Sequence, residues 1–322
     1  MARIVKLIAA LLSLALLSAM ALVLAARNGW LTPSDEELRL RYALPASQFI
    51  ELDGATIHFI DEGSGVPVVL MHGSFGSLRD WDAAAQVLRS DYRVIRYDLP
   101  RLGLSGPTPV GNDGLEADIA MIGALANELQ LERFVLISTS SSAASAMAWA
   151  AQNPERLYGL VLSNFAIAPI GMDLSHLSPW FKLVLAVDRW FDGWHPRALW
   201  REAMRNGFHV DARIADDYVA RWTDLNNRAQ RMPPRSSPMT AKTMFTRAPD
   251  DLAKITVPPL LTWSEFDEEM PLETVGFEAL DMLATEDRTL IVVPDCGHML
   301  PLECGAQSAE LALPFLERVA GN

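Results

Sequence analysis

The chain has 322 residues, of which 50% are hydrophobic, so it can bury a large core in one big catalytic domain or two smaller ones. Acidic residues outnumber basic residues 40 to 27, giving a formal net charge of −13. This balance argues against nucleic acid as a partner, because binding to phosphates requires clustered lysine and arginine.

The first predicted element is an N-terminal membrane segment within residues 1–30. Residues 7–26 carry no charge, and at about 1.5 Å rise per residue this run is long enough to cross the hydrocarbon layer as a helix. Arg3 and Lys6 precede it, which favours a cytoplasmic N-terminus and a catalytic domain on the periplasmic or extracellular side. A cleaved signal peptide, followed by secretion, is the alternative, although the apolar run is longer than is usual for such peptides.

The catalytic domain opens with a helix and a hairpin. Ser34, followed by three acidic residues, is typical of a capped helix start. Residues 48–63 then alternate apolar and polar on both sides of Asp53-Gly54, which predicts a β-hairpin with a two-residue turn. His58 lies in this hairpin and is expected to be structural.

Short apolar runs after the hairpin predict buried strands, and most are separated by stretches with helical patterning. The runs are VPVVLM, RVIRY, RFVLI, LYGLVL, PPLLTW and RTLIVV. Such alternation indicates an α/β fold with a mostly parallel sheet flanked by helices.

The alternation lapses between the fourth and fifth of these runs. Residues 165–257 are rich in tryptophan and methionine and predict helices and loops, which we interpret as a cap inserted into the domain. The core would then comprise residues 31–164 and 258–322. An apolar cap would favour a substrate with a hydrophobic acyl or alcohol part, although ordinary packing within the cap explains the same composition.

A candidate nucleophile, Ser140, follows an apolar strand directly and precedes an alanine-rich helix. This is the sequence setting of a nucleophile elbow, a sharp turn that exposes the serine hydroxyl at the edge of a sheet. The positions flanking it, normally glycine, are Ser138 and Ser142, which are small but weaken the motif. A capped loop rich in serine is the alternative for this segment alone.

A second loop is expected to complete an oxyanion hole. His72-Gly73 ends the first parallel strand, and the turn can direct the backbone N–H of Ser74 at the same oxyanion as the N–H of Ser141. Phe75 is the weaker candidate donor. We expect His72 to support the turn, because another histidine is better placed as a base.

That better histidine is His298, in a loop between the last predicted strand and the final helix. Asp267 ends the preceding strand, where its carboxylate can hold the imidazole in the required tautomer. The remaining histidines, His176, His195 and His209, lie in the cap. The order nucleophile, acid, histidine with all three at strand ends is far more specific than any single motif.

Together these segments resemble the α/β-hydrolase family over about residues 48–318. The matching stretches are HGSFGS, YDLPRLGLSGP, STSSSAAS, NPERLYGLVL, WSEFD and CGHMLPLE, in the order of the family. The chain departs from the family glycine at Arg101 and Ser264 as well as in the elbow. A serine nucleophile, where the dehalogenases and epoxide hydrolases of the family use aspartate, implies acyl transfer.

The expected activity is therefore that of a serine hydrolase acting on a carboxylic ester, through Ser140, His298, Asp267 and an acyl-enzyme. The same machinery could cleave a lactone, thioester, amide or carbon–carbon bond or transfer the acyl group to an alcohol. A non-catalytic, membrane-tethered binding protein is the rival from another class. We expect neither cofactor nor metal, and we interpret Cys296 and Cys304 as free thiols, because their spacing matches no C-x-x-C site.

Overall fold

The computed structural model describes residues 2–109, 112, 114–169, 177–191, 193–233 and 241–321. These residues form an eight-stranded sheet in the order β1-β2-β4-β3-β5-β6-β7-β8. The strands are β1 (Ser47–Leu52), β2 (Ala55–Gly63), β3 (Val66–Met71), β4 (Tyr92–Tyr97), β5 (Phe134–Thr139), β6 (Leu157–Ser163), β7 (Pro259–Ser264) and β8 (Thr289–Val293). All six apolar runs and the hairpin are thus confirmed as strands.

The sheet is parallel except at one edge. β1 and β2 form the predicted antiparallel hairpin, in which Asp53 and Gly54 take positive φ angles of 49° and 80°. β2 is also antiparallel to β4, and the pairs from β4 through β3, β5, β6 and β7 to β8 are all parallel. The carboxyl ends of the parallel strands therefore share one edge of the sheet.

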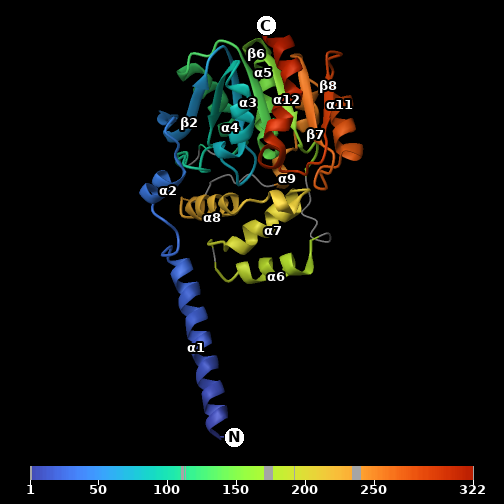
Figure 1. Ribbon diagram of the computed structural model, residues 1–322. Coiled ribbons are helices and arrows are strands. Elements are labelled where there is room, and N and C mark those ends of the chain that lie inside the picture. The colour runs from blue at the N-terminus through green and yellow to red at the C-terminus, as the bar shows by residue number, and fades with distance from the viewer. Residues whose placement is uncertain are drawn as a thin grey trace.

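Helices cover both faces of the sheet because its strands are apolar on both sides. One face packs against α4 (Leu115–Glu128), α5 (Ala143–Gln152), α10 (Ala248–Leu252) and α11 (Phe277–Met282), and the other against α3 (Asp82–Leu88) and α12 (Leu300–Ala320). This is the three-layer architecture expected from the sequence, and in Figure 1 the sheet extends from β2 on the left to β8 on the right.

A helical region follows β6, before the chain returns to the sheet at β7. It contains α6 (Pro179–Asp188), α7 (Arg197–Gly207), α8 (Asp216–Gln230) and α9 (Ala241–Met244). Its own hydrophobic cluster joins α6, α7 and α8 and is distinct from the clusters beside the sheet. In Figure 1, α6, α7 and α8 lie on the side of the sheet from which the N-terminal helix projects. His176 lies outside the described residues.

The N-terminal helix α1 (Ala2–Arg27) projects away from the rest of the molecule (Figure 1). It is long and apolar enough to cross a bilayer, although a signal sequence would also meet this criterion. After a short turn, Ser34 caps α2 (Asp35–Tyr42) through the predicted capping box with Glu37. α2 then packs against α8.

The cysteines correct one expectation. Cys296 and Cys304 are joined in a disulfide, with 6.2 Å between their Cα atoms, and are not free thiols. The eight-residue spacing of the two cysteines in the sequence does not by itself predict this disulfide. The chain turns between β8 and the first turn of α12, which brings the two side chains together around the loop that contains His298.

Candidate active site

Ser140 sits on a sharp turn between β5 and α5, at the carboxyl edge of the sheet. Its φ angle of 53° places this non-glycine residue in the sparsely populated left-handed region. A short 3₁₀ turn, Ser140–Ser142, leads directly into α5. The segment thus has the strand–turn–helix geometry expected of a nucleophile elbow, despite the missing glycines.

The serine that replaces an elbow glycine has a structural use. Ser142 Oγ lies 3.1 Å from the carbonyl oxygen of Met71 and 2.9 Å from that of Thr139, and it accepts a hydrogen bond from the Thr139 N–H. These contacts tie the turn to the end of the neighbouring strand β3. The Ser142 hydroxyl therefore stabilises the turn by hydrogen bonds, which a glycine at this position could not make.

His298 lies between Ser140 and Asp267. Its Nε2 is 3.1 Å from Ser140 Oγ, and its Nδ1 is 2.9 Å from Asp267 Oδ2. Asp267 accepts two further hydrogen bonds at Oδ1, from the backbone N–H groups of Glu269 and Met270. Because the Asp267 carboxylate can only accept, it directs the Nδ1 proton towards itself and leaves Nε2 free to accept the serine proton.

A second carboxylate approaches the same histidine. Glu269 Oε2 lies 3.6 Å from His298 Nε2, on the side that faces Ser140. Burial lowers the pKa of His298, but the charges of the Asp267 and Glu269 carboxylates and the hydrogen bond that His298 donates to Asp267 outweigh burial and raise this pKa to about 9. The histidine is therefore more basic than an isolated imidazole.

The loop after β3 approaches the elbow closely. A Cβ atom on Gly73 would lie 3.1 Å from Ser140 Cβ, so glycine is what allows the two segments to meet. His72 supports the turn as expected, because its Nδ1 lies 2.8 Å from the Gly73 carbonyl oxygen and its Nε2 accepts from the Leu99 N–H. The roles of the Ser74 and Ser141 amides as oxyanion donors remain predictions.

Comparison with known proteins identifies the family of this chain. The model of the "Alpha/beta hydrolase family" matches residues 68–311. The chain belongs to the α/β-hydrolase family.

Individual relatives of this α/β-hydrolase carry different names. It is 26% identical over 282 residues to a 2-hydroxy-6-oxononadienedioate/2-hydroxy-6-oxononatrienedioate hydrolase of Cupriavidus pinatubonensis, covering 84% of this chain and 95% of that relative. Among solved structures, an esterase from Thermogutta terrifontis has a TM-score of 0.66 at 23% identity, covering 85% and 99% of the two chains. A bacterial membrane phospholipase A has a TM-score of 0.67 at 19% identity, with both chains covered completely. These two likenesses establish the fold alone.

The structure adds a residue that the sequence did not indicate as part of the site, Asn164 at the end of β6. Its buried side-chain amide donates to Ser264 Oγ at 2.8 Å and to the carbonyl oxygen of His298 at 3.0 Å. Its Oδ1 accepts from the Ser264 N–H. Asn164 therefore fixes the histidine loop to the end of β7, the strand that precedes Asp267, and the Ser264 hydroxyl is an acceptor that a family glycine would lack.

Glu303 fixes the other side of the histidine loop. Its carboxylate accepts from the backbone N–H groups of Gly297, His209 and Val210, the last two in the helical region. The disulfide between Cys296 and Cys304 closes the same loop. A lone glutamate in the first turn of a helix gives no sequence signal for this role.

The helical region meets the site at the loop after β3. Trp200 packs against Phe75 with ring centroids 5.3 Å apart, and Asn226 donates to the Phe75 carbonyl oxygen. Arg221 of α8 forms a buried ion pair with Asp80 at 3.4 Å. Of the tryptophans of this region, Trp200 and Trp222 are buried near the site, Trp194 is partly buried, and Trp180 and Trp190 are exposed.

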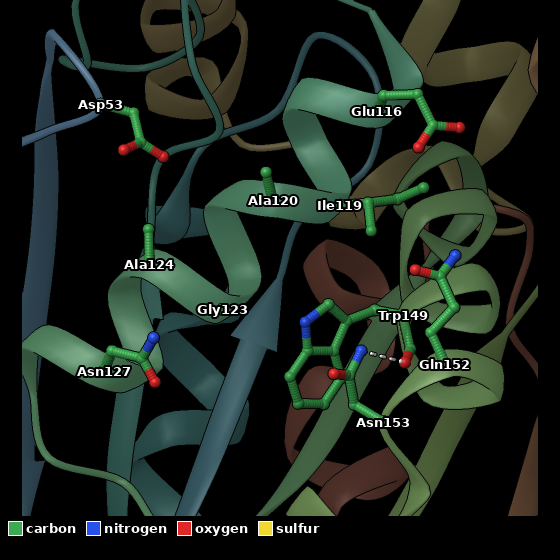
Figure 2. A pocket seen from close by; sticks show the side chains of 10 residues that line it. All are labelled: Asp53, Glu116, Ile119, Ala120, Gly123, Ala124, Asn127, Trp149, Gln152 and Asn153. Carbon is green, nitrogen blue, oxygen red and sulfur yellow. Dashed lines mark hydrogen bonds between the residues drawn. The ribbon is translucent and has the colours of Figure 1, made fainter.

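Other candidate sites stay apart from Ser140. His58 bonds to Asp98 and Ser47, and His195 bonds to Asp188, as structural histidines would. A hollow of about 550 Å³ between α4 and α5 is lined by residues such as Gly123 and Trp149 and by none of the triad (Figure 2). Within the described residues, no group of three or more His, Cys, Asp or Glu side chains could hold a metal ion.

Proposed function

We propose that this α/β-hydrolase cleaves a carboxylic ester of a small, hydrophobic substrate, with Ser140 as nucleophile, His298 as base and Asp267 as its orienting carboxylate. The observation that carries the proposal is the continuous contact from Ser140 Oγ through the His298 ring to Asp267, at 3.1 Å and 2.9 Å. A serine on a strained turn, within reach of an oriented imidazole, is the arrangement that acyl transfer requires.

The reaction would proceed in two halves. His298 Nε2 takes the hydroxyl proton as Ser140 Oγ bonds to the ester carbonyl carbon, and the amides of Ser74 and Ser141 stabilise the oxyanion. The ester bond breaks as His298 returns the proton to the departing alcohol, leaving an acyl-enzyme. Water, deprotonated by His298, then releases the acid and restores Ser140.

The electrostatics around His298 favour an uncharged ester over the second candidate, a dianion cleaved at a carbon–carbon bond. Relatives include carbon–carbon hydrolases, and the name of the Cupriavidus enzyme specifies a dioate, a substrate with two carboxylates. In this chain the Glu269 carboxylate, 3.6 Å from His298 Nε2, would repel an anionic group there. A neutral ester meets no such penalty.

The packing near the site also suits an apolar ester. Phe75 is half exposed beside the buried Trp200, and Met299 follows His298 directly and packs in the cluster of the helical region. Aromatic and methionine side chains provide apolar contact area that adapts to the shape of a substrate. We therefore expect longer acyl chains to be preferred over acetyl.

Hydrolysis of p-nitrophenyl esters of increasing acyl length tests this proposal, with the full-length protein in detergent and Ser140→Ala as control. We expect activity that Ser140→Ala reduces by about five orders of magnitude. Labelling of Ser140 by an organophosphonate without ester turnover would favour another acyl substrate, such as a lactone, thioester or amide. Turnover of the dioate alone would favour the carbon–carbon hydrolase. Absence of labelling at Ser140 would favour a binding protein.

We also propose that α1 is retained as a single-pass anchor, with the catalytic domain on the periplasmic or extracellular side. The disulfide supports this side, because disulfides persist in oxidising compartments. Retention of the intact chain in membranes after alkaline extraction is the expected result. Release of a chain shortened by the N-terminal segment would favour the secreted alternative.

A further inference from the structure

Helix α6 carries two sets of apolar side chains. Phe181 and Val184 are buried in the cluster that α6 shares with α7 and α8. A second set of side chains is about half exposed or more and recurs at intervals of three or four residues: Trp180, Leu183 and Val187 on α6, and Trp190 just beyond its end at Asp188. We call these four residues the α6 stripe. α6 also carries the exposed Lys182, but the stripe presents four large apolar side chains to solvent in the described chain, which is the kind of surface that marks an interaction site.

The α6 stripe adjoins the end of α1 that is nearest the catalytic domain. The Arg27 guanidinium Nε donates to the carbonyl oxygen of Trp190 at 3.2 Å, so the last residue of α1 contacts the end of the stripe. Trp30, in the turn after α1, is 77% exposed. In Figure 1, α6 is level with this end of α1 and runs across its direction, on the side of the molecule from which α1 projects.

Polar contacts fix the segment that follows α1 to the helical region, so α1 is not joined to it by a loose linker. Arg231 Nη2 donates to the Pro33 carbonyl oxygen at 2.8 Å, and Arg228 pairs with Asp35 at 3.1 Å. Asp224 of α8 accepts from Tyr42 Oη at 2.7 Å, at the end of α2. The orientation of the anchor therefore determines which side of the helical region faces the membrane.

We propose that the α6 stripe is a lipid-binding surface, which inserts into the membrane interface beside α1 together with Trp30. If α1 spans the bilayer, α6 lies along the interface, where tryptophan side chains are favoured because the ring is apolar and the indole N–H can still reach water. This inference rests on the retained anchor proposed above. It adds a second attachment that fixes the tilt of the catalytic domain.

The surface also narrows the class of substrate. The buried face of α6 packs in the same cluster as Trp200, which touches Phe75, and as Met299, which follows His298. The region that contacts the active-site loops is therefore held against the lipid. Esters that dissolve in the membrane, such as those with long acyl chains, would reach Ser140 without first entering bulk water.

An environment-sensitive fluorophore on a single cysteine tests this proposal in the full-length chain. Cys296 and Cys304 are paired with each other, so Leu183→Cys provides the one reactive thiol among the described residues. In phosphatidylcholine and phosphatidylglycerol vesicles, we expect nitroxide-labelled lipids to quench the probe at residue 183 by about twofold. The matched control is Leu311→Cys, an exposed leucine on α12, where we expect no lipid quenching.

Three outcomes would overturn the proposal. In the first, the protein binds vesicles but the probe at residue 183 is quenched by a water-soluble quencher and not by lipid nitroxides, so α6 lies in water. A protected probe without lipid quenching shows that a second protein copy covers the stripe. In the third, the chain has lost its N-terminal segment and does not bind vesicles, so α1 is not a retained anchor and the proposal loses its premise. Failure of the wild type to hydrolyse esters would instead contradict the proposed activity and leave the quenching result unchanged.

Discussion

The carboxyl edge of the sheet and the outer face of the helical region differ in how their residues are held. At the sheet edge, the loop of His298 is fixed by buried hydrogen bonds from Asn164, by Glu303 and by a disulfide. The four side chains of the α6 stripe are large, apolar and about half exposed or more. The first region therefore provides a defined geometry, and the second provides apolar area.

This difference indicates which kind of function each region can support. A proton transfer requires donor and acceptor to stay within hydrogen-bond distance, so even small displacements lower the rate. Contact with lipid requires only apolar surface at the right depth. Substitutions at the sheet edge should therefore reduce the rate of the chemical step on every substrate, with effects that depend on the contact removed.

Apart from loss of the Ser140 nucleophile itself, the largest effect is expected from Asp267→Asn. An asparagine retains the acceptor for the N–H groups of Glu269 and Met270, but its amide would face His298 Nδ1 and favour the wrong tautomer. We expect kcat for a p-nitrophenyl ester to fall by about 10⁴-fold with little change in folding. Asp287→Asn, at a surface ion pair with Arg318, is the control and should leave kcat as it is. An Asp267→Asn enzyme with nearly full activity would remove Asp267 from the triad.

A smaller loss is expected from Asn164→Ala. This change removes the links to Ser264 and to the His298 carbonyl oxygen, so the imidazole is no longer held over Ser140. We expect kcat to fall by about a hundredfold while KM changes little. Asn153→Ala removes an equivalent side chain at the end of α5 and serves as the comparison (Figure 2). Equal effects of the two substitutions would argue against a positioning role for Asn164.

Removal of the disulfide should mainly affect stability. Changing both Cys296 and Cys304 to serine frees a short loop in the unfolded chain and should lower the free energy of unfolding by about 2.5 kcal/mol in the chain-entropy view. Thermal unfolding measures the loss, and kcat should decline less than in Asn164→Ala because Glu303 still holds the loop. Reductant should lower the Tm of the wild type and leave the double variant unaffected. A reductant-insensitive wild type would contradict this prediction.

The smallest effect concerns pH. His298 acts as base only when neutral, and its pKa of about 9 means that kcat/KM should rise with pH up to that value. Glu269→Gln removes a nearby negative charge and should lower the midpoint of this rise by about one unit, so activity at neutral pH increases. Glu268→Gln, at the adjacent exposed residue, should leave the profile in place. An unchanged midpoint in Glu269→Gln would show that Glu269 does not act on His298.

The same raised pKa affects folding. Since the folded-state pKa of about 9 exceeds the ordinary value of 6.5, protonated His298 contributes stability that is fully present below pH 6.5. This contribution is lost as pH rises through 9. Thermal unfolding across this window should show the loss in the wild type and a smaller change in Glu269→Gln.

The sequence by itself determined the strands and the order of the residues proposed for the triad. Apolar runs identified every parallel strand, and Asp53-Gly54 identified the hairpin, because these signals depend on neighbours in sequence. Ser140, Asp267 and His298 could be proposed because each follows a recognisable strand. Their convergence at one edge then follows from the parallel arrangement of those strands.

Only the tertiary structure decided the contacts between distant segments. The disulfide, the links from Asn164 to residues 100 and 134 positions away, and the approach of Glu269 to His298 depend on how loops fold over the sheet edge. From the sequence alone, the tryptophans of the helical region could equally cover a bound substrate or pack in the hydrophobic core of that region. Their division into buried Trp200 and exposed Trp180 and Trp190 follows from which face each helix presents, which composition does not encode.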